Sequence, residues 1–308
     1  MNGKTGVAEE TTLLDNSTLS IALWESLAKY STFKIGGKAK YVIKAENRNQ
    51  FIEGVRLFTE HGIPFYVLGG GSNVLIDDKD WNGGVLITKT PPTDFIYDNG
   101  IVEVYSGDFL PALVHKLASW NLGGLEFLVG VPGTVGGAIV MNAGSSSVGI
   151  CNFVEKVEVI DNSGNIYILH RSDLTWGYRY CKLPVKGYIS RAWIRVEDKS
   201  AHDVLAYVRE HMAWRRQHQP IDMPCAGSFF KNPPEAAAGY LIDKAGLKGY
   251  QVGGAQVSTK HANFIINVGG ATAADVLAVA DHIKKTVKNK FGIDLTAEVR
   301  FIDHALGG

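Results

Sequence analysis

Three consecutive glycines between two apolar runs constrain the fold of this chain more than any other feature. Residues 65–68 form an apolar run that predicts a buried strand, and a second run, 74–76, begins directly after the segment 69–73. Three adjacent glycines lose much conformational entropy on folding, so they are expected where the backbone turns tightly or admits a close neighbour. Successive N–H groups in such a turn form a hollow that suits a phosphate group. The segment therefore predicts a phosphate-binding loop between two strands, with an ordinary glycine-rich hairpin as the alternative.

A second glycine-rich stretch extends this prediction to a dinucleotide. A Rossmann turn needs a helix directly after its glycines and an acidic residue about 20 positions further on, whereas a β-rich segment follows residues 69–73. The second stretch, residues 130–137, is expected to begin a helix at Thr134, and the helix N-terminus would add another phosphate site. Two such loops beside apolar strands predict a site for the two halves of one large cofactor. The alternative is that Gly136 and Gly137 only permit close packing.

The composition excludes several classes of protein. The chain has 308 residues, of which 45% are hydrophobic and 20% charged, as in an ordinary globular protein of two or three domains. Lys+Arg and Asp+Glu are equal at 31 each, which gives no electrostatic reason to expect nucleic acid or an anionic membrane as a partner. The three cysteines form no C-x-x-C pair, so we expect a reducing compartment, no disulfide framework and no metal site. Without an apolar signal segment or a run of membrane-spanning length, the protein is expected to be cytoplasmic.

The order of apolar patterns predicts an α+β fold with a boundary near residue 200. Apolar side chains at helical spacing in 51–58 lie between predicted strands at 41–43 and 65–68. A hairpin is expected around the turn at 162–165. After Asp198 the pattern becomes mainly helical, and Thr272 with Asp275 forms a capping box before a long helix.

Polar residues in three segments are candidates for chemistry, each with a simpler alternative. Arg179 lies between two tyrosines, where it can bind a carboxylate through two hydrogen bonds or merely stack on a ring. Ser228 lies among aromatic residues and prolines, either in a dry pocket or as the cap of a turn. Arg216 ends a predicted helix, where compensation of the helix dipole is the alternative role. Glu298 lies just before an apolar strand, and a single acidic residue in that place does not by itself indicate a function.

Taken in order, short motifs in this chain resemble those of the UDP-N-acetylenolpyruvoylglucosamine reductases (UDP-N-acetylmuramate dehydrogenases). The resemblance runs from about Tyr30 to Ile302. The motifs are the two glycine-rich stretches, Tyr178-Arg179, Gly227-Ser228-Phe229-Phe230-Lys231-Asn232-Pro233, Leu247-Lys248-Gly249 and Glu298-Val299-Arg300-Phe301.

The resemblance implies an α+β flavoprotein with the two-subdomain FAD-binding fold of the vanillyl-alcohol-oxidase/PCMH type, plus a C-terminal α+β substrate-binding domain. The expected divisions are an N-terminal tail at 1–29, FAD-binding subdomains at 30–88 and 89–200, a substrate-binding domain at 201–296, and a strand at 297–308 that returns to the FAD-binding region. The protein is expected to be a monomer.

The resemblance also implies a reaction of peptidoglycan synthesis. NADPH reduces non-covalently bound FAD, and hydride then passes to the methylene carbon of UDP-N-acetylglucosamine enolpyruvate. A proton on the neighbouring carbon completes UDP-N-acetylmuramate. Arg179 and Glu298 match the family positions that stabilise the enolate, and Ser228 matches the proton donor. The positive charge of Arg179 would stabilise the negatively charged enolate directly. A carboxylate would not, so Glu298 must be protonated or orient another donor.

Further binding residues follow from the same motifs. FAD contacts are expected at Gly69, Gly70, Gly71, Ser72, Asn73, Val74, Gly130, Val131, Pro132, Gly133, Thr134, Gly136, Gly137 and Asn142. The sugar nucleotide is expected to contact Arg216, Asn232 and Lys248.

Two departures from the family pattern stand out. The chain has Ser145-Ser146-Ser147 where the family usually has an aromatic and glycine-rich turn, and Cys181 where a serine is common. Either change is expected to affect cofactor contacts or rate, not the reaction type.

Two other functions compete with this reading. One is an alcohol or sugar oxidase of the same flavin fold, but many of those attach FAD covalently through a histidine near the first phosphate loop, and residues 69–73 contain none. The other is a non-enzymatic nucleotide-binding protein, which would not need Arg179, Ser228 and Glu298.

Overall fold

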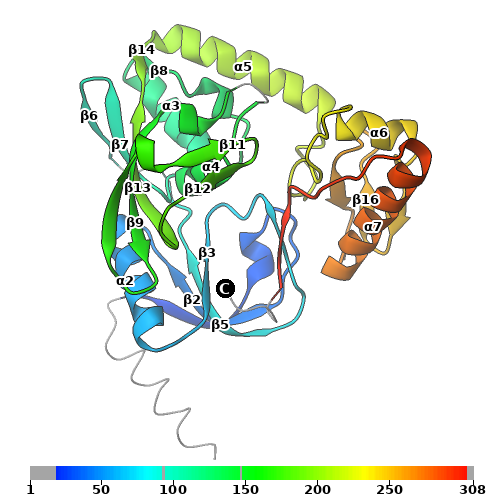
Figure 1. Ribbon diagram of the computed structural model, residues 1–308, viewed down its shortest axis with the longest axis horizontal. Helices are drawn as coiled ribbons and strands as arrows, with labels where there is room; N and C mark the ends of the chain where they lie inside the picture. The colour runs from blue at the N-terminus through cyan, green and yellow to red at the C-terminus, as the bar shows by residue number, and fades with distance from the viewer. Residues whose placement is uncertain (1–18, 92–93, 146–147, 304–308) are drawn as a thin grey trace, which may run out of the picture.

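The computed structural model describes residues 19–303, except 92–93 and 146–147. The predicted tail is therefore described only from residue 19, and Ser146 and Ser147 lie outside the described residues. Two neighbouring parts, each with helices and strands, make up one side of the molecule, and a smaller part of both helices and strands lies beside them (Figure 1). The predicted divisions at residues 88, 200 and 296 stay predictions, and residues 21–26 of the predicted tail form a strand that pairs with residues 38–43.

The first part is a four-stranded sheet in the order β1-β2-β5-β3. Its three neighbouring strands β2, β5 and β3 are parallel, which places their carboxyl ends at one edge. Helix α2 packs on the sheet through the buried residues Phe51, Val55 and Phe58 and begins where Asn47 accepts a hydrogen bond from the Gln50 N–H at 3.0 Å. The elements are β1 (Ile21–Ser26), the 3-10 helix η1 (Leu27–Tyr30), β2 (Lys38–Lys44), α2 (Arg48–Glu60), β3 (Phe65–Leu68), β4 (Val74–Ile76) and β5 (Trp81–Ile87).

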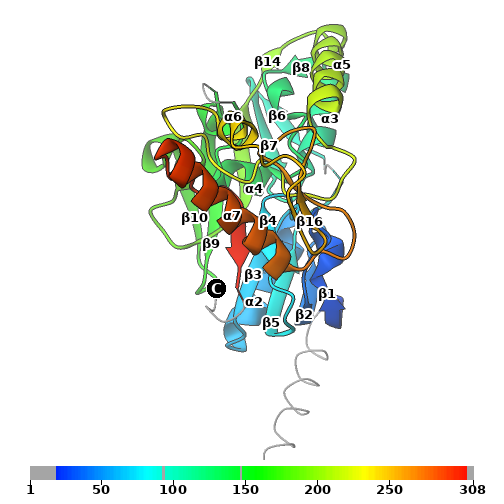
Figure 2. The same cartoon turned by 90° about the vertical axis from the view of Figure 1, so that its right-hand side faces the viewer.

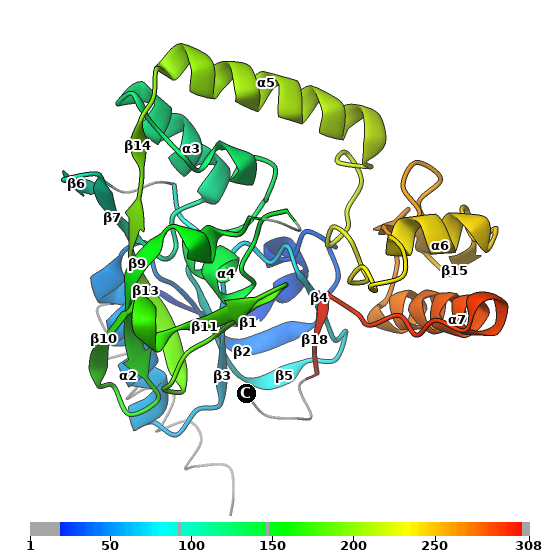
Figure 3. The same ribbon diagram turned by 45° about the horizontal axis from the view of Figure 1, so that its top comes forward.

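The second part is a five-stranded antiparallel sheet, β10-β9-β13-β7-β6, covered by α3 and α4. The predicted hairpin at 162–165 is confirmed by the pairing of β9 with β10. A shorter hairpin, β11–β12, projects from this part towards the first (Figure 3). The elements are β6 (Ile96–Asp98), β7 (Ile101–Tyr105), α3 (Leu110–Ser119), β8 (Leu122–Gly123), η2 (Glu126–Leu128), α4 (Val135–Val140), η3 (Ile150–Asn152), β9 (Val154–Asp161), β10 (Ile166–His170), η4 (Arg171–Asp173), β11 (Thr175–Gly177), β12 (Tyr180–Lys182), β13 (Gly187–Arg195) and β14 (Glu197–Asp198).

The third part is reached through the long helix α5, which runs from the second part towards it (Figure 3). A three-stranded sheet, β15-β16-β17, packs with α6 and α7. The predicted capping box is confirmed at the start of α7, and Gly292 ends this helix with φ 73°. The elements are α5 (Ala201–His218), α6 (Ala238–Lys244), β15 (Gln251–Val252), β16 (Ala255–Val257), β17 (Ile265–Asn267), α7 (Ala273–Phe291) and β18 (Arg300–Ile302).

Specific contacts hold the three parts together. Arg48 of α2 forms a bidentate ion pair with the buried Glu158 of β9. Arg48 Nε donates to Glu158 Oε1 at 2.5 Å, and Arg48 Nη2 donates to Glu158 Oε2 at 2.8 Å. Asp78 accepts a hydrogen bond from the Ala273 N–H at the start of α7, at 2.6 Å. After α7 the chain crosses back, and β18 pairs in parallel with β4 (Figure 2). The third part is therefore attached to the first at both ends of its longest helix.

Within the described residues, no helix is both long enough and apolar enough to span a membrane.

Candidate functional site

The first glycine loop leaves a row of backbone donors unused. It joins the end of β3 to the start of β4, and Gly71 has φ 61°. The Thr32 N–H and hydroxyl hold the loop by donating to the Gly71 carbonyl oxygen at 3.0 and 3.2 Å. From Gly69 to Asn73, no backbone N–H donates to another described residue. Such a row of free donors is a suitable cradle for a phosphate group.

The second glycine loop packs directly against the first. A Cβ added at Gly69 would lie 2.4 Å from Thr134 Oγ1, and one at Gly70 would lie 2.8 Å from the Pro132 carbonyl oxygen. These glycines are therefore required for the two loops to touch. The predicted helix is confirmed, because Thr134 caps α4 through a 3.4 Å hydrogen bond from the Gly137 N–H.

The start of α4 differs from the expected phosphate site. The Val135 N–H donates to the Asp108 carbonyl oxygen at 3.1 Å, and the Gly136 N–H donates to the Ser106 carbonyl oxygen at 2.8 Å. With these donors engaged inside the protein, the second loop mainly supports the first. The alternative of close packing applies to Gly136, where an added Cβ would lie 3.0 Å from Ser106 Cβ.

A cavity of about 580 Å³ opens beside the first loop. It lies outside the carboxyl ends of β2, β3 and β5, which is where parallel sheets usually bind ligands. Its lining includes Gly69 and Gly70 together with four lysines and one glutamate, namely Lys29, Lys34, Lys44, Lys89 and Glu46. The excess of positive charge favours an anion such as a diphosphate. The lysines were not singled out from the sequence, although Lys44 and Lys89 lie at the ends of strands that lead to this edge.

The β11–β12 hairpin and the C-terminal segment bring Arg179 and Glu298 together. Arg179 Nε lies 2.7 Å from Glu298 Oε1, with the two side chains only 18% and 15% exposed. Arg179 also donates to the Gly144 carbonyl oxygen at 3.2 Å and has φ 63°, which a non-glycine residue rarely adopts. It stacks on Tyr178 as well, so the predicted alternative contact coexists with the ion pair. The strained turn indicates that the position of this guanidinium is closely specified.

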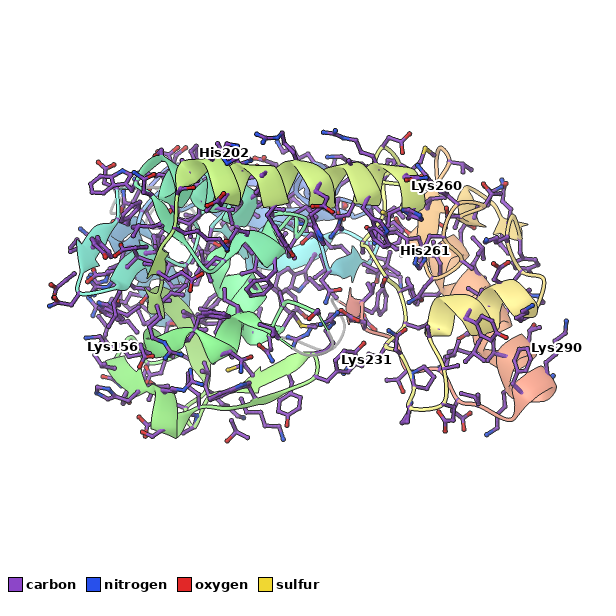
Figure 4. The ribbon with its side chains drawn as sticks, turned by 90° about the horizontal axis from the view of Figure 1, so that it is seen from above. Lys156, His202, Lys231, Lys260, His261 and Lys290 are labelled. Atoms are coloured by element: carbon purple, nitrogen blue, oxygen red, sulfur yellow. The ribbon has the colours of Figure 1, made fainter. Side chains whose placement is uncertain are left out.

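The Glu298 carboxyl is held in an environment that opposes its ionisation. Burial raises the pKa of Glu298 above its usual value, while the positive charges of Arg179 and Lys231 act in the opposite direction. Figure 4 labels Lys231 where the third part meets the rest of the molecule. The same glutamate is tied to the first glycine loop, because Asn73 Nδ2 donates to its carbonyl oxygen at 3.2 Å.

Backbone pairing places Ser228 beside Glu298. The Glu298 N–H donates to the Phe229 carbonyl oxygen at 2.8 Å, and Phe230 forms an isolated bridge with Ala297. Buried Asn263 fixes the other edge of this segment through two hydrogen bonds to the Phe230 backbone, at 2.8 and 2.9 Å. Ser228 itself is half-buried, and its side chain has no hydrogen bond to another described residue. The predicted turn cap is therefore not formed, and the hydroxyl is available to a ligand.

Two of the three predicted sugar-nucleotide residues, Arg216 and Lys248, lie near the turn that carries Lys260 and His261, which are both labelled in Figure 4. The Lys260 ammonium group donates to the Arg216 carbonyl oxygen. Burial lowers the pKa of His261, and the charge of Lys248 acts in the same direction. Asn232 accepts a hydrogen bond from the Ala238 N–H at 3.0 Å and so helps to begin α6.

Asn142, a predicted FAD contact, and Arg215, the neighbour of the predicted Arg216, have surroundings that the sequence did not indicate. The Asn142 amide donates to the Gly177 carbonyl oxygen at 2.9 Å and accepts from the Cys151 N–H at 3.1 Å, so it supports the β11–β12 hairpin. Arg215, rather than the exposed Arg216, lies against the second loop, where an added Cβ at Gly130 would be 2.3 Å from Arg215 Nη1. Arg215 Nε is buried without a hydrogen-bond partner among the described residues, and burial lowers the pKa of this guanidinium. Helix spacing alone does not distinguish two adjacent arginines, so no pattern in the sequence favoured Arg215 over Arg216.

Two family models match different parts of the chain. An FAD binding domain matches residues 39–170, which contain both glycine loops. The C-terminal domain of UDP-N-acetylenolpyruvoylglucosamine reductase matches residues 219–302, which contain Ser228 and Glu298.

Whole-length relatives agree with these models. The UDP-N-acetylenolpyruvoylglucosamine reductase of Caldanaerobacter subterraneus subsp. tengcongensis is 40% identical over 279 residues, covering 90% of this chain and 92% of the relative. The reductase of Chlamydia trachomatis serovar L2 is 38% identical over 297 residues, covering 96% of this chain and 100% of the relative. The crystal structure of the Thermus caldophilus reductase (MurB) has a TM-score of 0.77 and 33% identity, covering 92% of this chain and 99% of that one.

Proposed function

Because this chain belongs to the UDP-N-acetylenolpyruvoylglucosamine reductase family, we propose that it uses NADPH to reduce the enolpyruvyl group of UDP-N-acetylglucosamine enolpyruvate. The chain is an FAD-binding oxidoreductase of peptidoglycan synthesis. The proposed product is UDP-N-acetylmuramate. Bound FAD supplies the hydride relay between the nicotinamide and the substrate. We further propose that the enzyme acts as a monomer in the cytoplasm. Light scattering of the purified protein would measure its oligomeric state.

The first glycine loop and its cavity fit the diphosphate of this cofactor. In our proposal the free N–H groups from Gly69 to Asn73 donate to phosphate oxygens, and Lys44 and Lys89 balance the charge. The second loop, with Pro132 and Thr134 against the first, keeps this cradle in shape. A cavity lined by four lysines and by a loop whose donors are free supports this part of the proposal.

Arg179 is proposed to stabilise the negative charge that develops when hydride adds to the enolpyruvyl double bond. A fixed cation in a largely buried site stabilises such charge more effectively than a cation in water. Glu298 is proposed to keep the guanidinium in place through the 2.7 Å contact. Burial also raises the pKa of the Glu298 carboxyl, so it takes up a proton more readily than an exposed glutamate does.

Ser228 is proposed to deliver the proton that completes the reaction. A hydroxyl is a weak acid, so it serves only when held close to a strongly basic carbon. The backbone pairing with Glu298 and the two hydrogen bonds that Asn263 makes with the Phe230 backbone supply that constraint. Arg216, Asn232 and Lys248 are proposed to hold the sugar nucleotide beside it.

The observation that carries the proposal is the meeting of Arg179, Glu298 and Ser228 from three distant segments. A simple binding protein has no need for this arrangement. Purified protein should oxidise NADPH rapidly only when the enolpyruvyl sugar nucleotide is present, and mass spectrometry should detect a product with two added hydrogens. Oxidation of NADPH that is independent of this substrate would contradict the proposal.

The role of Ser228 can be tested by separating the two half-reactions in rapid mixing. In Ser228→Ala, reduction of the flavin by NADPH should proceed at the wild-type rate. Reoxidation by the enolpyruvyl substrate should slow by about 10²–10⁴-fold, the usual contribution of a general acid. Ser163→Ala, at the exposed β9–β10 turn, is the matched control. Equal slowing of both halves would assign Ser228 a role in pocket shape instead.

A further inference from the structure

Arg215, in the last turn of α5, carries a positive charge that the described residues do not neutralise. Its Nε atom is buried without a hydrogen-bond partner. Its two Nη atoms donate to no described residue either, yet they are not among the atoms buried without a partner, so they keep some contact with solvent. No carboxylate among the described residues forms an ion pair with Arg215. The guanidinium therefore has a buried side and an accessible tip, and neither has a partner in the protein.

The titratable groups near Arg215 do not supply the missing negative charge. Burial raises the pKa of the Cys225 thiol, although the Gly227 N–H and the charge of Arg215 act in the opposite direction, so this thiol is neutral at neutral pH. His211, one turn earlier on α5, can only add positive charge, and burial together with the charge of Arg215 lowers its pKa. Because arginine keeps its proton in proteins, this buried charge destabilises the fold unless an anion joins it.

Gly130 provides the space in which the guanidinium lies. An added Cβ at Gly130 would be 2.3 Å from Arg215 Nη1 and 2.7 Å from Arg215 Cζ, so any side chain there would displace the charged group. Gly130 lies two residues before Pro132, which packs against Gly70 of the first loop. The Cα atoms of residues 130 and 132 are at most about 7 Å apart. Arg215 is thus held beside the same short segment that supports the phosphate-binding loop.

The end of α5 also reaches the third part of the molecule. The helix runs from the second part towards the third (Figure 3), and the Lys260 ammonium group donates to the carbonyl oxygen of the adjacent Arg216. Arg215 therefore lies where the FAD-binding part meets the part proposed to hold the sugar nucleotide. FAD and the nucleotide substrates each carry a diphosphate, and a guanidinium can donate two parallel hydrogen bonds to phosphate oxygens.

We propose that the Arg215 guanidinium binds the diphosphate of a nucleotide ligand, which supplies the negative charge that the protein lacks. This chemistry has two sources, bound FAD or a nucleotide substrate that enters the cleft beside it. The substrate source rests on the proposed function, whereas the FAD source does not. In either case the ligand turns an unpaired buried charge into a charge-assisted contact, so Arg215 strengthens binding and weakens the ligand-free fold.

The test compares Arg215→Met with Arg209→Met, the matched control at an exposed position of the same helix. FAD is titrated into the flavin-free full chain, and UDP-N-acetylmuramate and NADP⁺ are titrated separately into the flavin-loaded protein. We expect Arg215→Met to weaken binding of at least one ligand by roughly 10–10²-fold, the usual contribution of hydrogen bonds to a charged group. Arg209→Met should bind all three ligands as the wild type does.

The melting temperature of the flavin-free protein separates binding from a structural role. Removal of an unpaired buried charge should leave flavin-free Arg215→Met at least as stable as the wild type, so its melting temperature should be equal or higher. A residue that only supports the fold would lower the melting temperature when replaced. Arg215→Lys keeps the charge but cannot donate the parallel pair, so it should weaken the same ligand by less than Arg215→Met does.

Each outcome decides the proposal. Weaker FAD binding would assign Arg215 to the cofactor, and weaker binding of UDP-N-acetylmuramate or NADP⁺ would assign it to a substrate. Unchanged affinity for all three ligands would overturn the proposal. A lower melting temperature of flavin-free Arg215→Met, or failure of both Arg215 variants to fold, would show a structural role and overturn it as well. If the wild type binds FAD but does not reduce the enolpyruvyl substrate, the proposed function fails, while the FAD titration still decides the role of Arg215.

Discussion

The two glycine-rich loops look alike in sequence, yet they engage their backbone groups in opposite ways. From Gly69 to Asn73 the N–H groups have no acceptor among the described residues and lie beside a lysine-lined cavity. At the start of α4, by contrast, the Val135 and Gly136 N–H groups donate to carbonyl oxygens of the segment before α3. Glycine therefore allows ligand approach in the first loop and close packing of protein on protein in the second. The distinction lies in where the donors go, not in the number of glycines.

The largest expected effect comes from a side chain between the loops. In Gly70→Val the new Cβ would lie 2.8 Å from the Pro132 carbonyl oxygen, which is too close. The two loops must therefore separate, and the phosphate-binding loop must distort. Loss of two hydrogen bonds to a charged group, at about 1.5–3 kcal/mol each, weakens FAD binding by roughly 10²–10⁴-fold. The purified wild type should be yellow. The flavin absorbance of each purified protein measures the fraction of its molecules that hold FAD.

The matched control for that variant is Gly137→Ala in the second loop. An added Cβ there meets only Thr134 Oγ1, at 3.5 Å, which is an ordinary contact. Gly137→Ala should keep its flavin, and circular dichroism should show that both variants fold. Full occupancy in Gly70→Val would contradict the assignment of the first loop.

The flavin of the wild type should also be released by acid, since residues 69–73 contain no histidine for covalent attachment.

The next effect concerns the contact that holds the two loop-bearing parts together. Glu158 is 2% exposed, and hydrogen bonds from Arg48, Ser190 and Arg191 outweigh burial and hold its pKa at about 2. Because the folded pKa is lowered, this stabilisation is complete above the unfolded value of about 4.3 and is lost as the pH falls towards about 2. Glu158→Gln should destabilise the protein by about 3 kcal/mol at neutral pH, as expected when one partner of a buried pair is removed.

Urea unfolding of the wild type and Glu158→Gln across this pH range gives the measurement. The difference in unfolding free energy between them should shrink as the pH falls below about 4.3. A difference that is constant with pH would show that packing, not charge, explains the loss. Glu155→Gln, which removes a more exposed carboxylate that pairs with Arg195, is the control and should change stability by less than about 1 kcal/mol.

A smaller effect distinguishes packing from binding in the second loop. Gly136→Ala adds a methyl group 3.0 Å from Ser106 Cβ and 3.3 Å from its carbonyl oxygen. Overpacking of this kind typically destabilises by about 1–3 kcal/mol. Thermal unfolding should show this loss, while the folded fraction binds FAD with nearly wild-type affinity. A large loss of flavin affinity with unchanged stability would move Gly136 into the binding site.

The smallest effect tests the charge of the cavity. Lys44→Gln removes one of the four lysines that line it and leaves the glycine loop intact. We expect FAD binding to weaken by about 10-fold or less, because a partly exposed charge contributes about 1 kcal/mol. Titration of flavin-free protein at low and high salt should show that the difference between Lys44→Gln and wild type decreases as salt screens the charge. Lys186→Gln, on the β12–β13 connection, is the control.

Local patterns were sufficient for most elements and for the reaction class. The apolar spacing of Phe51, Val55 and Phe58 predicted α2, and Thr272 with Asp275 predicted the start of α7, because capping and amphipathic spacing act within a few residues. The order of the motifs predicted the family that the comparisons show. The polar residues around the site were harder to predict. Lys89, Asn263 and Arg215 are important in the structure, yet nothing near them in the sequence distinguishes them from surface or core residues.

The sequence by itself determined the two glycine loops, the α+β succession of elements and the segments that carry Arg179, Ser228 and Glu298. Only the tertiary structure decided which loop keeps its N–H groups free, since that depends on carbonyl oxygens supplied by residues 106 and 108. It also decided that Arg179 meets Glu298 across 119 positions of the chain. The physical reason is that hydrogen bonds and ion pairs depend on distance in space, whereas turns, caps and periodicity depend on neighbours along the chain.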